Sequence, residues 1–248
     1  MSEGSLFFDG QGRVQKSLVR IARKFDELGI EYAVADGMAL FAHGHRRFTE
    51  DIDILVTRES LERVHEELDG RGWVRPFSKS KNLRDADTGV RVEFLLSGDY
   101  PGDGKPKPVQ FPDPHGAAVE MDGVKYLNLA TFIDLKLASG MTGGAHRAKD
   151  LVDVGELIKS LSLPESLADS LNPFVRPTFL DLWQQLNASQ HRYVMAQADA
   201  ANRLAEMLAD GVRVAPLTAG DKGPILETLD PVIANKYGMI DATDFFDA

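Results

Sequence analysis

Apolar and polar positions alternate along the first half of the chain with two periods, one typical of helices and one typical of strands. Between Arg13 and Leu28 the apolar residues return every three or four positions, which predicts an amphipathic helix that ends at Gly29. The pattern then predicts, in chain order, a buried strand at 30–35, a turn at Asp36-Gly37, a short helix at 38–45, a strand at 49–56, a helix at 60–68 and a short strand at 72–77.

Two hairpins follow. Residues 82–96 form two extended runs around Asp87-Thr88-Gly89, with the second strand from Val90 to Leu96, and residues 119–129 repeat the arrangement. Between them, the segment 97–114 is rich in glycine and proline. Such a composition predicts an exposed loop, which is a candidate lid or partner surface.

Helical periodicity dominates after these hairpins. It predicts helices at 130–139, 148–160, 173–187 and about 191–208. The expected fold class is α+β, a mixed β-sheet flanked by helices with a C-terminal helical region. The expected division is a mixed unit at 1–128, a helical unit at 129–210 and a loosely structured tail at 211–248.

Length and composition restrict the class of protein. A chain of 248 residues with 43% apolar residues can bury one sizeable core with a helical annex. No apolar run approaches the roughly 20 residues that span a bilayer, and the N-terminus lacks the pattern of a secretory signal. We therefore expect a cytoplasmic protein without a membrane partner, and the sequence leaves its oligomeric state open.

Charge and cysteine content narrow the chemistry further. The formal net charge of −10 argues against broad attraction to nucleic acid, so an RNA partner would need a local basic patch. The chain has no cysteine, so a metal would be held by carboxylate or imidazole groups. Mg²⁺ is the expected ion, with Mn²⁺ as an alternative.

The strand at 49–56, TEDIDILV, opens with acidic residues although the rest of it is apolar. Residues two apart on a strand share a face, so Asp51 and Asp53 project together while Ile52 and Ile54 face the core. The two carboxylates repel each other unless a cation lies between them. The structural alternative is that Asp51 caps a turn and Asp53 is solvated, which is the commoner situation for an isolated D-x-D.

Two nearby features favour the functional interpretation. Gly37 opens a short helix whose N-terminal N–H groups suit a phosphate. Glu93 interrupts the apolar strand VRVEFLL and faces away from Val92 and Phe94, as a third metal ligand or a general base would. A place for Glu93 on the wet face of its hairpin is the structural alternative.

These motifs together resemble the nucleotidyltransferase superfamily of the polymerase-beta type. The ordered segments are Asp36-Gly37, HGHRRFTEDIDILV (43–56), VEFLL (92–96), LNLATFIDLKLASG (127–140) and HRAKDLVDVGELI (146–158). The second and the last two are similar to the branch of AbiEii-related and MenT-like toxins, and the resemblance covers about Tyr32 to Ile158. It implies transfer of a nucleotide from an NTP, with Mg²⁺, to a hydroxyl on tRNA, a protein or a small molecule. It also implies a toxin of a toxin–antitoxin or phage-defence system, with a cognate antitoxin as partner.

The resemblance assigns roles to particular residues. Asp51, Asp53 and Glu93 would bind the metal, with Glu93 as an alternative base. Lys136 would meet the triphosphate or the leaving pyrophosphate. The remaining roles are approach of the backbone to the triphosphate at Gly37, phosphate neutralisation by Arg46 and Arg47, and shaping of the nucleotide pocket by Asp150, with Asp153 as a weaker candidate.

Some residues have simpler interpretations. Lys136 lies in an otherwise apolar helix, where a cation needs an anionic partner unless it reaches the surface. Arg46 and Arg47 suit phosphate but are also ordinary loop charges. Thr49 is expected to support the strand. His43 and His45 could orient a nucleotide, although a helix-end or solvent contact is the more common role.

Two departures from the family pattern weaken the transfer of roles, and the first of them favours a rival hypothesis. Asp36 stands where the family has a glycine, and it adds bulk and negative charge near the expected triphosphate. The third acid is Glu93 rather than the commoner Asp. The rival is a catalytically lapsed nucleotidyltransferase-fold module that binds a nucleotide or a partner. A further alternative gives the function to the helices at 173–208, through self-association or an antitoxin.

Overall fold

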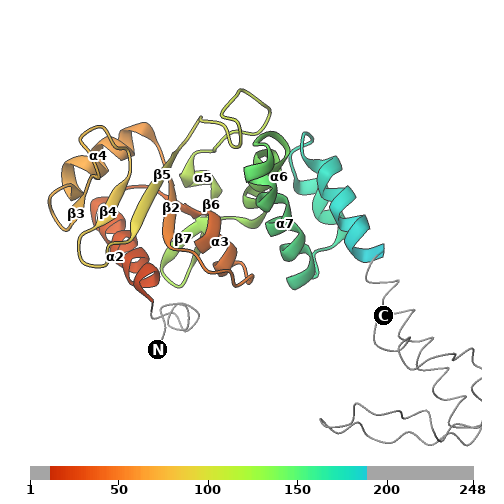
Figure 1. The fold of residues 1–248 in the computed structure, drawn as a ribbon, viewed down its shortest axis with the longest axis horizontal. Coiled ribbons are helices and arrows are strands. Elements are labelled where there is room, and N and C mark those ends of the chain that lie inside the picture. Colours follow the sequence, from red (N-terminus) through yellow and green to blue (C-terminus); the bar gives the residue numbers. More distant parts are fainter. Residues whose placement is uncertain (1–11, 189–248) are drawn as a thin grey trace, which may run out of the picture. The chain divides into compact units, whose positions relative to one another are not determined.

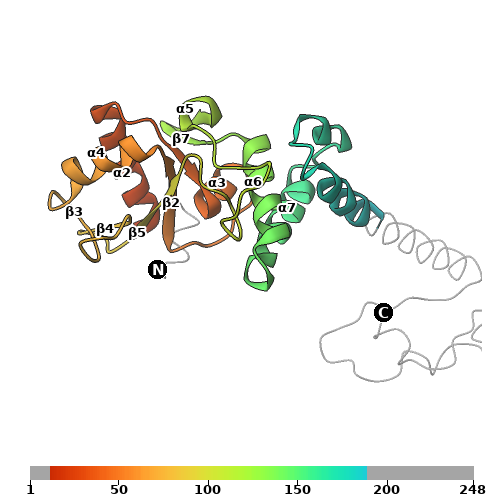
Figure 2. The same ribbon diagram turned by 90° about the horizontal axis from the view of Figure 1, so that it is seen from above.

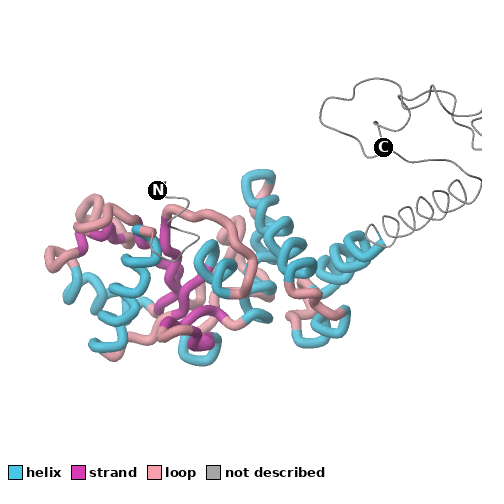
Figure 3. The backbone as a smooth tube through the Cα atoms, turned by 90° about the horizontal axis from the view of Figure 1, so that it is seen from below, coloured by secondary structure: helices cyan, strands magenta, loops and turns pink. Residues whose placement is uncertain are grey.

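The structure is a computed structural model that describes residues 12–188, nearly all of them in the first of two compact units, Met1–Asn187 and Ala188–Ala248. A seven-stranded sheet runs through the first unit with helices beside it (Figures 1 and 3). The strands are β1 (Ala33–Ala35), β2 (Asp51–Val56), β3 (Trp73–Val74), β4 (Leu83–Asp85), β5 (Arg91–Leu96), β6 (Ala118–Met121) and β7 (Val124–Leu127). The helices are α2 (Arg13–Leu28), α3 (Asp36–Ala42), α4 (Arg58–Leu68), α5 (Pro114–Ala117), α6 (Leu129–Thr142) and α7 (Ala148–Ser160), with 3₁₀ helices η1 (Ala145–Arg147) and η2 (Glu165–Ser170) and helical residues 176–188.

The sheet is mixed, in the order β3-β4-β5-β2-β1-β7-β6. The pairs β2/β5 and β1/β7 are parallel, and the other neighbours are antiparallel. The helices α6 and α7 pack against each other (Figure 2). The predicted fold class, a mixed sheet flanked by helices and followed by a helical region, is confirmed.

Strong local patterns were sufficient for most elements. The helix predicted at Arg13–Leu28 has those bounds, and Gly29 ends it with a φ of 59°. The face of α2 toward the sheet is fully buried at Leu18, Ile21 and Phe25, which is the apolar stripe that the periodicity indicates. Both predicted hairpins are present as β4/β5 and β6/β7.

The structure corrects several predictions. Asp36-Gly37 is not a separate turn, because α3 begins at Asp36, whose φ of 41° makes the bend from β1 within one residue. The strand expected at 72–77 is only β3, since Pro76 has no N–H to continue the pairing. The strand expected at 30–35 is only β1. The short helices α5 and η2 were not predicted.

The predicted domain boundary at 128/129 falls between β7 and α6, inside the first compact unit, and stays a prediction. The helix expected at about 191–208 and the tail expected at 211–248 lie outside the described residues.

The beginning of α3 requires a residue without a side chain. Gly37 is buried, and a Cβ atom placed on it would lie 2.8 Å from Cβ of Thr49. Thr49 lies two residues before β2, the strand that carries Asp51 and Asp53, and its hydroxyl donates to Oδ1 of Asp51 at 2.8 Å. Close packing of α3 on this segment therefore helps to position β2.

We predict that Gly37→Ala lowers the free energy of unfolding by about 1–3 kcal/mol, because the added methyl group overpacks against Thr49. Gly116→Ala is the matched control, since a Cβ atom there meets nothing within 4 Å. Chemical denaturation of both variants measures the difference. A Gly37→Ala protein as stable as the control would contradict the close approach.

Candidate active site

Three carboxylates lie beside one another on the central strands. The register of the parallel pair β2/β5 places Asp53 opposite Glu93, and Asp51 precedes Asp53 on the same face of β2. The residues that follow the acids on the opposite face, Ile52 and Ile54 of β2 and Phe94 of β5, are buried, whereas all three acids are half-buried. The structure therefore brings together the three residues that the sequence suggested as metal ligands.

Arg91 lies against two of these acids. Its Nε is 2.9 Å from Oε1 of Glu93, and its terminal nitrogen donates to Oδ2 of Asp51 at 3.1 Å. The guanidinium thus partly neutralises the outer side of the carboxylate group. The sequence reasoning missed Arg91, although its position two residues before Glu93 on the same strand face was a usable signal.

Of the three acids Asp51, Asp53 and Glu93, Asp53 is the one whose negative charge is least compensated by neighbouring cations. Burial, together with the negative charges of Asp36, Asp51 and Glu93, raises its pKa to about 8, although Lys136 acts in the opposite direction. A divalent cation bound by the carboxylate oxygens of Asp51, Asp53 and Glu93 would offset the repulsion between them. The donor set, all carboxylate oxygen, fits Mg²⁺ or Mn²⁺.

A second group of charges forms around Lys136. Its ammonium lies 2.5 Å from Oδ1 of Asp36, 2.8 Å from Oδ1 of Asp150 and 2.9 Å from Oδ2 of Asp153. Ser139 donates to the other oxygen of Asp150 at 2.6 Å. Lys136 is buried, so the predicted need for an anionic partner is met three times within the protein.

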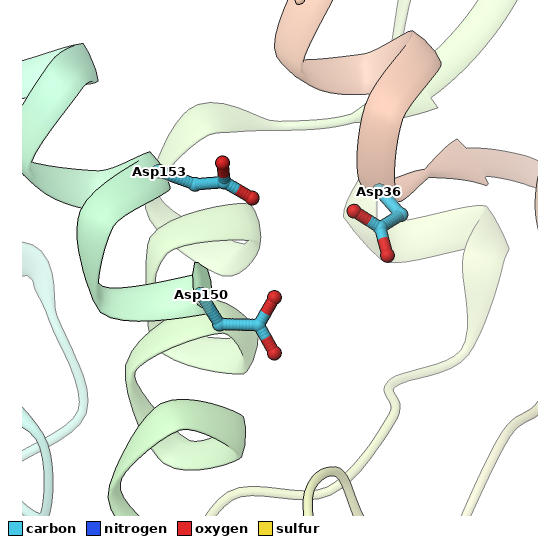
Figure 4. Close-up of side chains that lie close together, drawn as sticks. All are labelled: Asp36, Asp150 and Asp153. Atoms are coloured by element: carbon cyan, nitrogen blue, oxygen red, sulfur yellow. The ribbon is translucent and has the colours of Figure 1, made fainter. Parts of the chain in front are cut away.

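These partners come from different parts of the chain. Asp36 starts α3, whereas Asp150 and Asp153 project from α7, and the three carboxylates point toward one another (Figure 4). Burial acts to raise the pKa of Asp36, but the charge and hydrogen bond of Lys136 outweigh it and hold that pKa below its ordinary value.

Within residues 12–188, Asp36, Asp150 and Asp153 form the one group of three acids whose ligand oxygens all lie within 4.8 Å of one another. Asp51, Asp53 and Glu93 do not meet that criterion. Lys136 already supplies a cation to the tighter group, and Arg47 lies 3.5 Å from Asp36 and 3.6 Å from Asp153. The demand for a metal is therefore greater at Asp53, whose charge is less compensated.

The remaining predicted residues occupy the surrounding segment. Arg47 contacts the Lys136 group, and its buried Nε has no hydrogen-bond partner among the described residues. The guanidinium of Arg46 lies over the ring of Phe41, 5.7 Å from its centre. His43 caps α3 and shares a hydrogen bond of 2.8 Å with the Leu127 carbonyl. Burial lowers the pKa of His43, so its ring is neutral near pH 7.

Comparisons with known proteins give structural similarity only. No protein-family model and no curated protein matches the chain. Among solved structures, JHP933 from Helicobacter pylori is 18% identical, with 77% of this chain and 96% of that chain covered and a TM-score of 0.40. An antigenic nucleotidyltransferase-like protein from Paracoccidioides brasiliensis is 17% identical, with 75% and 91% covered and a TM-score of 0.43. ANT(2'')-Ia in complex with adenylyl-2''-tobramycin is 15% identical, with 67% and 95% covered and a TM-score of 0.44.

Each helix found within residues 12–188 is too short or too polar to span a bilayer.

We predict that Lys136→Met lowers the free energy of unfolding by about 3–5 kcal/mol at pH 7, because three carboxylates are left without their ammonium. The pKa of Asp36 is lowered in the folded protein, so its contribution is present above its unfolded pKa and is lost as pH falls through the folded value. The deficit of the variant should therefore shrink below about pH 4. Denaturation across pH measures it, with exposed Lys159→Met as control; equal deficits at all pH values would contradict the prediction.

We predict the opposite pH dependence for Asp53→Asn in EDTA. The folded-state pKa of Asp53 is about 8 against an ordinary 3.8, so the contribution of Asp53 to stability falls as pH rises between those values. Asparagine does not titrate, and the variant should gain about 2 kcal/mol over the wild type at pH 8 and little at pH 4. Mg²⁺ should reduce the gain. Asp122→Asn, in an exposed turn, is the control, and a gain independent of pH would be the contrary result.

Proposed function

We propose that the chain is a nucleotidyltransferase that moves an NMP from an NTP to an acceptor hydroxyl and releases pyrophosphate. The observation that carries the proposal is the register of β2 and β5, which sets Asp53 beside Glu93 with Asp51 on the same face. Arg91 pairs with Asp51 and Glu93 but not with Asp53, and burial together with the neighbouring carboxylates raises the pKa of Asp53 to about 8, which supports a cation-binding role for the group.

Asp51, Asp53 and Glu93 would hold Mg²⁺, with Mn²⁺ as an alternative. When bound, such an ion supplies charge neutralisation at the reacting phosphate and activates a hydroxyl nucleophile. The protein contributes positions for the ligands, because Thr49 orients Asp51 and the parallel register fixes Asp53 against Glu93. Rigid strands suit this role better than loops.

In this reaction the protein has to accept one proton, that of the acceptor hydroxyl. The acceptor oxygen forms a bond to the α-phosphorus, and the bond from that phosphorus to the oxygen bridging to the β-phosphate breaks. Glu93 takes the proton of the attacking hydroxyl, and pyrophosphate leaves with the bonding electrons. Positioning and charge neutralisation would supply most of the rate enhancement.

Cations near α3 would receive the triphosphate. Arg47 has an Nε donor without a partner among residues 12–188, and a phosphate oxygen is a suitable acceptor for it. Lys136 would contribute after exchanging one of its carboxylate partners for phosphate. We propose that the helical region after residue 128 completes the nucleotide site by supplying Lys136. Lys136 keeps its hydrogen bond to Asp150 while it contacts the phosphate.

The finer assignment to the AbiEii-related and MenT-like branch rests on the order of sequence motifs from Tyr32 to Ile158. It extends the proposal to a toxin of a toxin–antitoxin or phage-defence system with a cognate antitoxin. The acceptor would be tRNA, a protein or a small molecule. A cytoplasmic location stays a prediction.

One observation favours the rival, a catalytically lapsed nucleotide- or partner-binding module. Asp36 accepts a hydrogen bond of 2.5 Å from Lys136. The φ of Asp36, 41°, is a backbone conformation that glycine adopts without cost. A glycine there would leave Lys136 with two carboxylate partners instead of three and open space beside it. Asp36 therefore competes with a triphosphate for Lys136.

We predict that the wild-type chain, incubated with α-labelled NTPs, Mg²⁺ and cell extract, labels an acceptor, and that Asp51→Ala/Asp53→Ala reduces labelling at least 100-fold, since removing charge stabilisation costs about that much. Asp122→Asn is the matched surface control. Equal labelling by the double variant, or no labelling with any metal, would refute the transferase.

Calorimetry with NTP and Mg²⁺ separates the rival hypothesis from the first. A lapsed nucleotide-binding module would bind NTP yet label nothing, and a partner-binding module would not bind NTP in a manner that depends on Asp53. Because Asp36 competes with the triphosphate for Lys136, Asp36→Gly should restore or increase labelling if the rest of the site is intact. It should not do so if the site has lapsed at other residues.

A further inference from the structure

A basic pocket lies next to the three carboxylates. It has a volume of about 540 Å³ and is bordered by the loop after β3 and by β4 and β5. Four of its eight lining residues are cationic, namely Lys79, Lys81, Arg84 and Arg91, and none is acidic. Acidic residues outnumber basic ones 38 to 28 in the whole chain, so this pocket departs from the average charge of the protein.

The loop that forms the pocket is held in place by internal hydrogen bonds. Arg75 joins it to Asp69 through Nε at 2.6 Å and donates to the Ser78 carbonyl at 3.0 Å. Ser80 is buried and exchanges two hydrogen bonds of 3.0 Å with the backbone of Asn82. An ordered loop presents its cations in fixed positions, which reduces the entropy lost on binding a ligand.

The cations of this loop are available to a ligand. Lys79 and Lys81 are exposed and form no ion pair with any residue in the range 12–188. Arg84 is exposed, and within residues 12–188 its guanidinium donates only to the carbonyl of Gly89, at 2.7 Å. Neutralising several phosphates along a backbone releases counterions, which is the main source of affinity for nucleic acid.

An aromatic ring stands in the same pocket. Phe77 is 65% exposed, which is unusual for a large apolar side chain. An exposed ring among cations is the arrangement that binds single-stranded nucleic acid, because a base stacks on the ring while the phosphates meet the cations. An acidic peptide would use the cations but leave the ring without a flat partner, and a cationic small molecule would be repelled.

We propose that this pocket binds single-stranded RNA and that the RNA is the acceptor of the transfer reaction. The phosphates lie against Lys79, Lys81 and Arg84, and a base stacks on Phe77. The assignment of RNA as acceptor rests on the proposed transferase function, whereas the binding site stands on the pocket alone.

Arg91 connects the pocket to the carboxylates. It lines the pocket and contacts Asp51 at 3.1 Å and Glu93 at 2.9 Å. Arg91 thus separates the pocket from the acids by a single side chain, and in the proposal the terminal hydroxyl of the bound RNA reaches past Arg91 toward Glu93. Asp51 and Glu93 repel phosphate, so the proposed RNA can approach them only with an end that carries a free hydroxyl and no phosphate.

The test is fluorescence anisotropy with a labelled single-stranded RNA of about 10 nucleotides, in EDTA and without NTP. Lys79→Gln/Lys81→Gln should weaken binding about tenfold and reduce the slope of log affinity against log salt by about 1.4, since each phosphate contact on a single strand contributes about 0.7. Lys24→Gln/Lys159→Gln removes the same charge from two exposed helical sites and should bind like the wild type. Phe77→Leu should weaken binding about tenfold, and Phe77→Tyr should retain it.

Absence of RNA binding, or equal losses in the two lysine double variants, would overturn the proposal. Tighter binding of a polyglutamate peptide than of RNA, lost in Lys79→Gln/Lys81→Gln, would overturn it in favour of an acidic protein partner. Because these measurements contain neither metal nor NTP, they are independent of whether the chain transfers a nucleotide. RNA binding without nucleotide labelling would refute the transferase, and with it the acceptor role of the RNA, but not the RNA site. Labelling of a protein with no RNA binding would refute the RNA site and the acceptor role but not the transferase.

Discussion

The buried ammonium of Lys136 is the interaction on which the arrangement of this site depends. A lysine removed from water is stable only if carboxylates replace its hydration. Those carboxylates come from Asp36 at the start of α3 and from Asp150 and Asp153 on α7. The ion cluster therefore ties the helices after residue 128 to the sheet, and it sets the charge that a bound nucleotide would meet.

A second constraint is the repulsion among the acids of β2 and β5. Arg91 neutralises Asp51 and Glu93 from one side, but Asp53 remains next to three other carboxylates and its pKa rises to about 8. The protein thus places an internal cation in one acidic group and leaves the other short of positive charge. That difference separates an acidic group with its own internal cation from one that would gain from a bound cation, as the proposed function requires. The basic pocket beside Arg91 adds positive charge next to the second group.

Much of the fold could be predicted from local sequence, for physical reasons. The bounds of α2 follow from its apolar stripe and Gly29, and the hairpin β6/β7 follows from Asp122-Gly123, two residues that both take positive φ. The short strand β3 and the direct passage from β1 into α3 could not be predicted, because both depend on neighbours distant in sequence. The same holds for Gly37, whose lack of a side chain is required by Thr49.

The sequence by itself determined which residues are candidates for the chemistry: the spacing of Asp51 and Asp53 sets them on one strand face, and an isolated lysine in an apolar helix needs an anion. Only the tertiary structure decided their partners. Strand register placed Glu93 beside Asp53, and packing of α6 on α7, together with the ion pair to Asp36, gave Lys136 three internal carboxylates. The segment after β3 and the strands β4 and β5 brought the cations of the pocket together. Periodicity reports a residue's local face, whereas the identity of its neighbour depends on contacts across 100 residues of chain, as for Lys136 and Asp36.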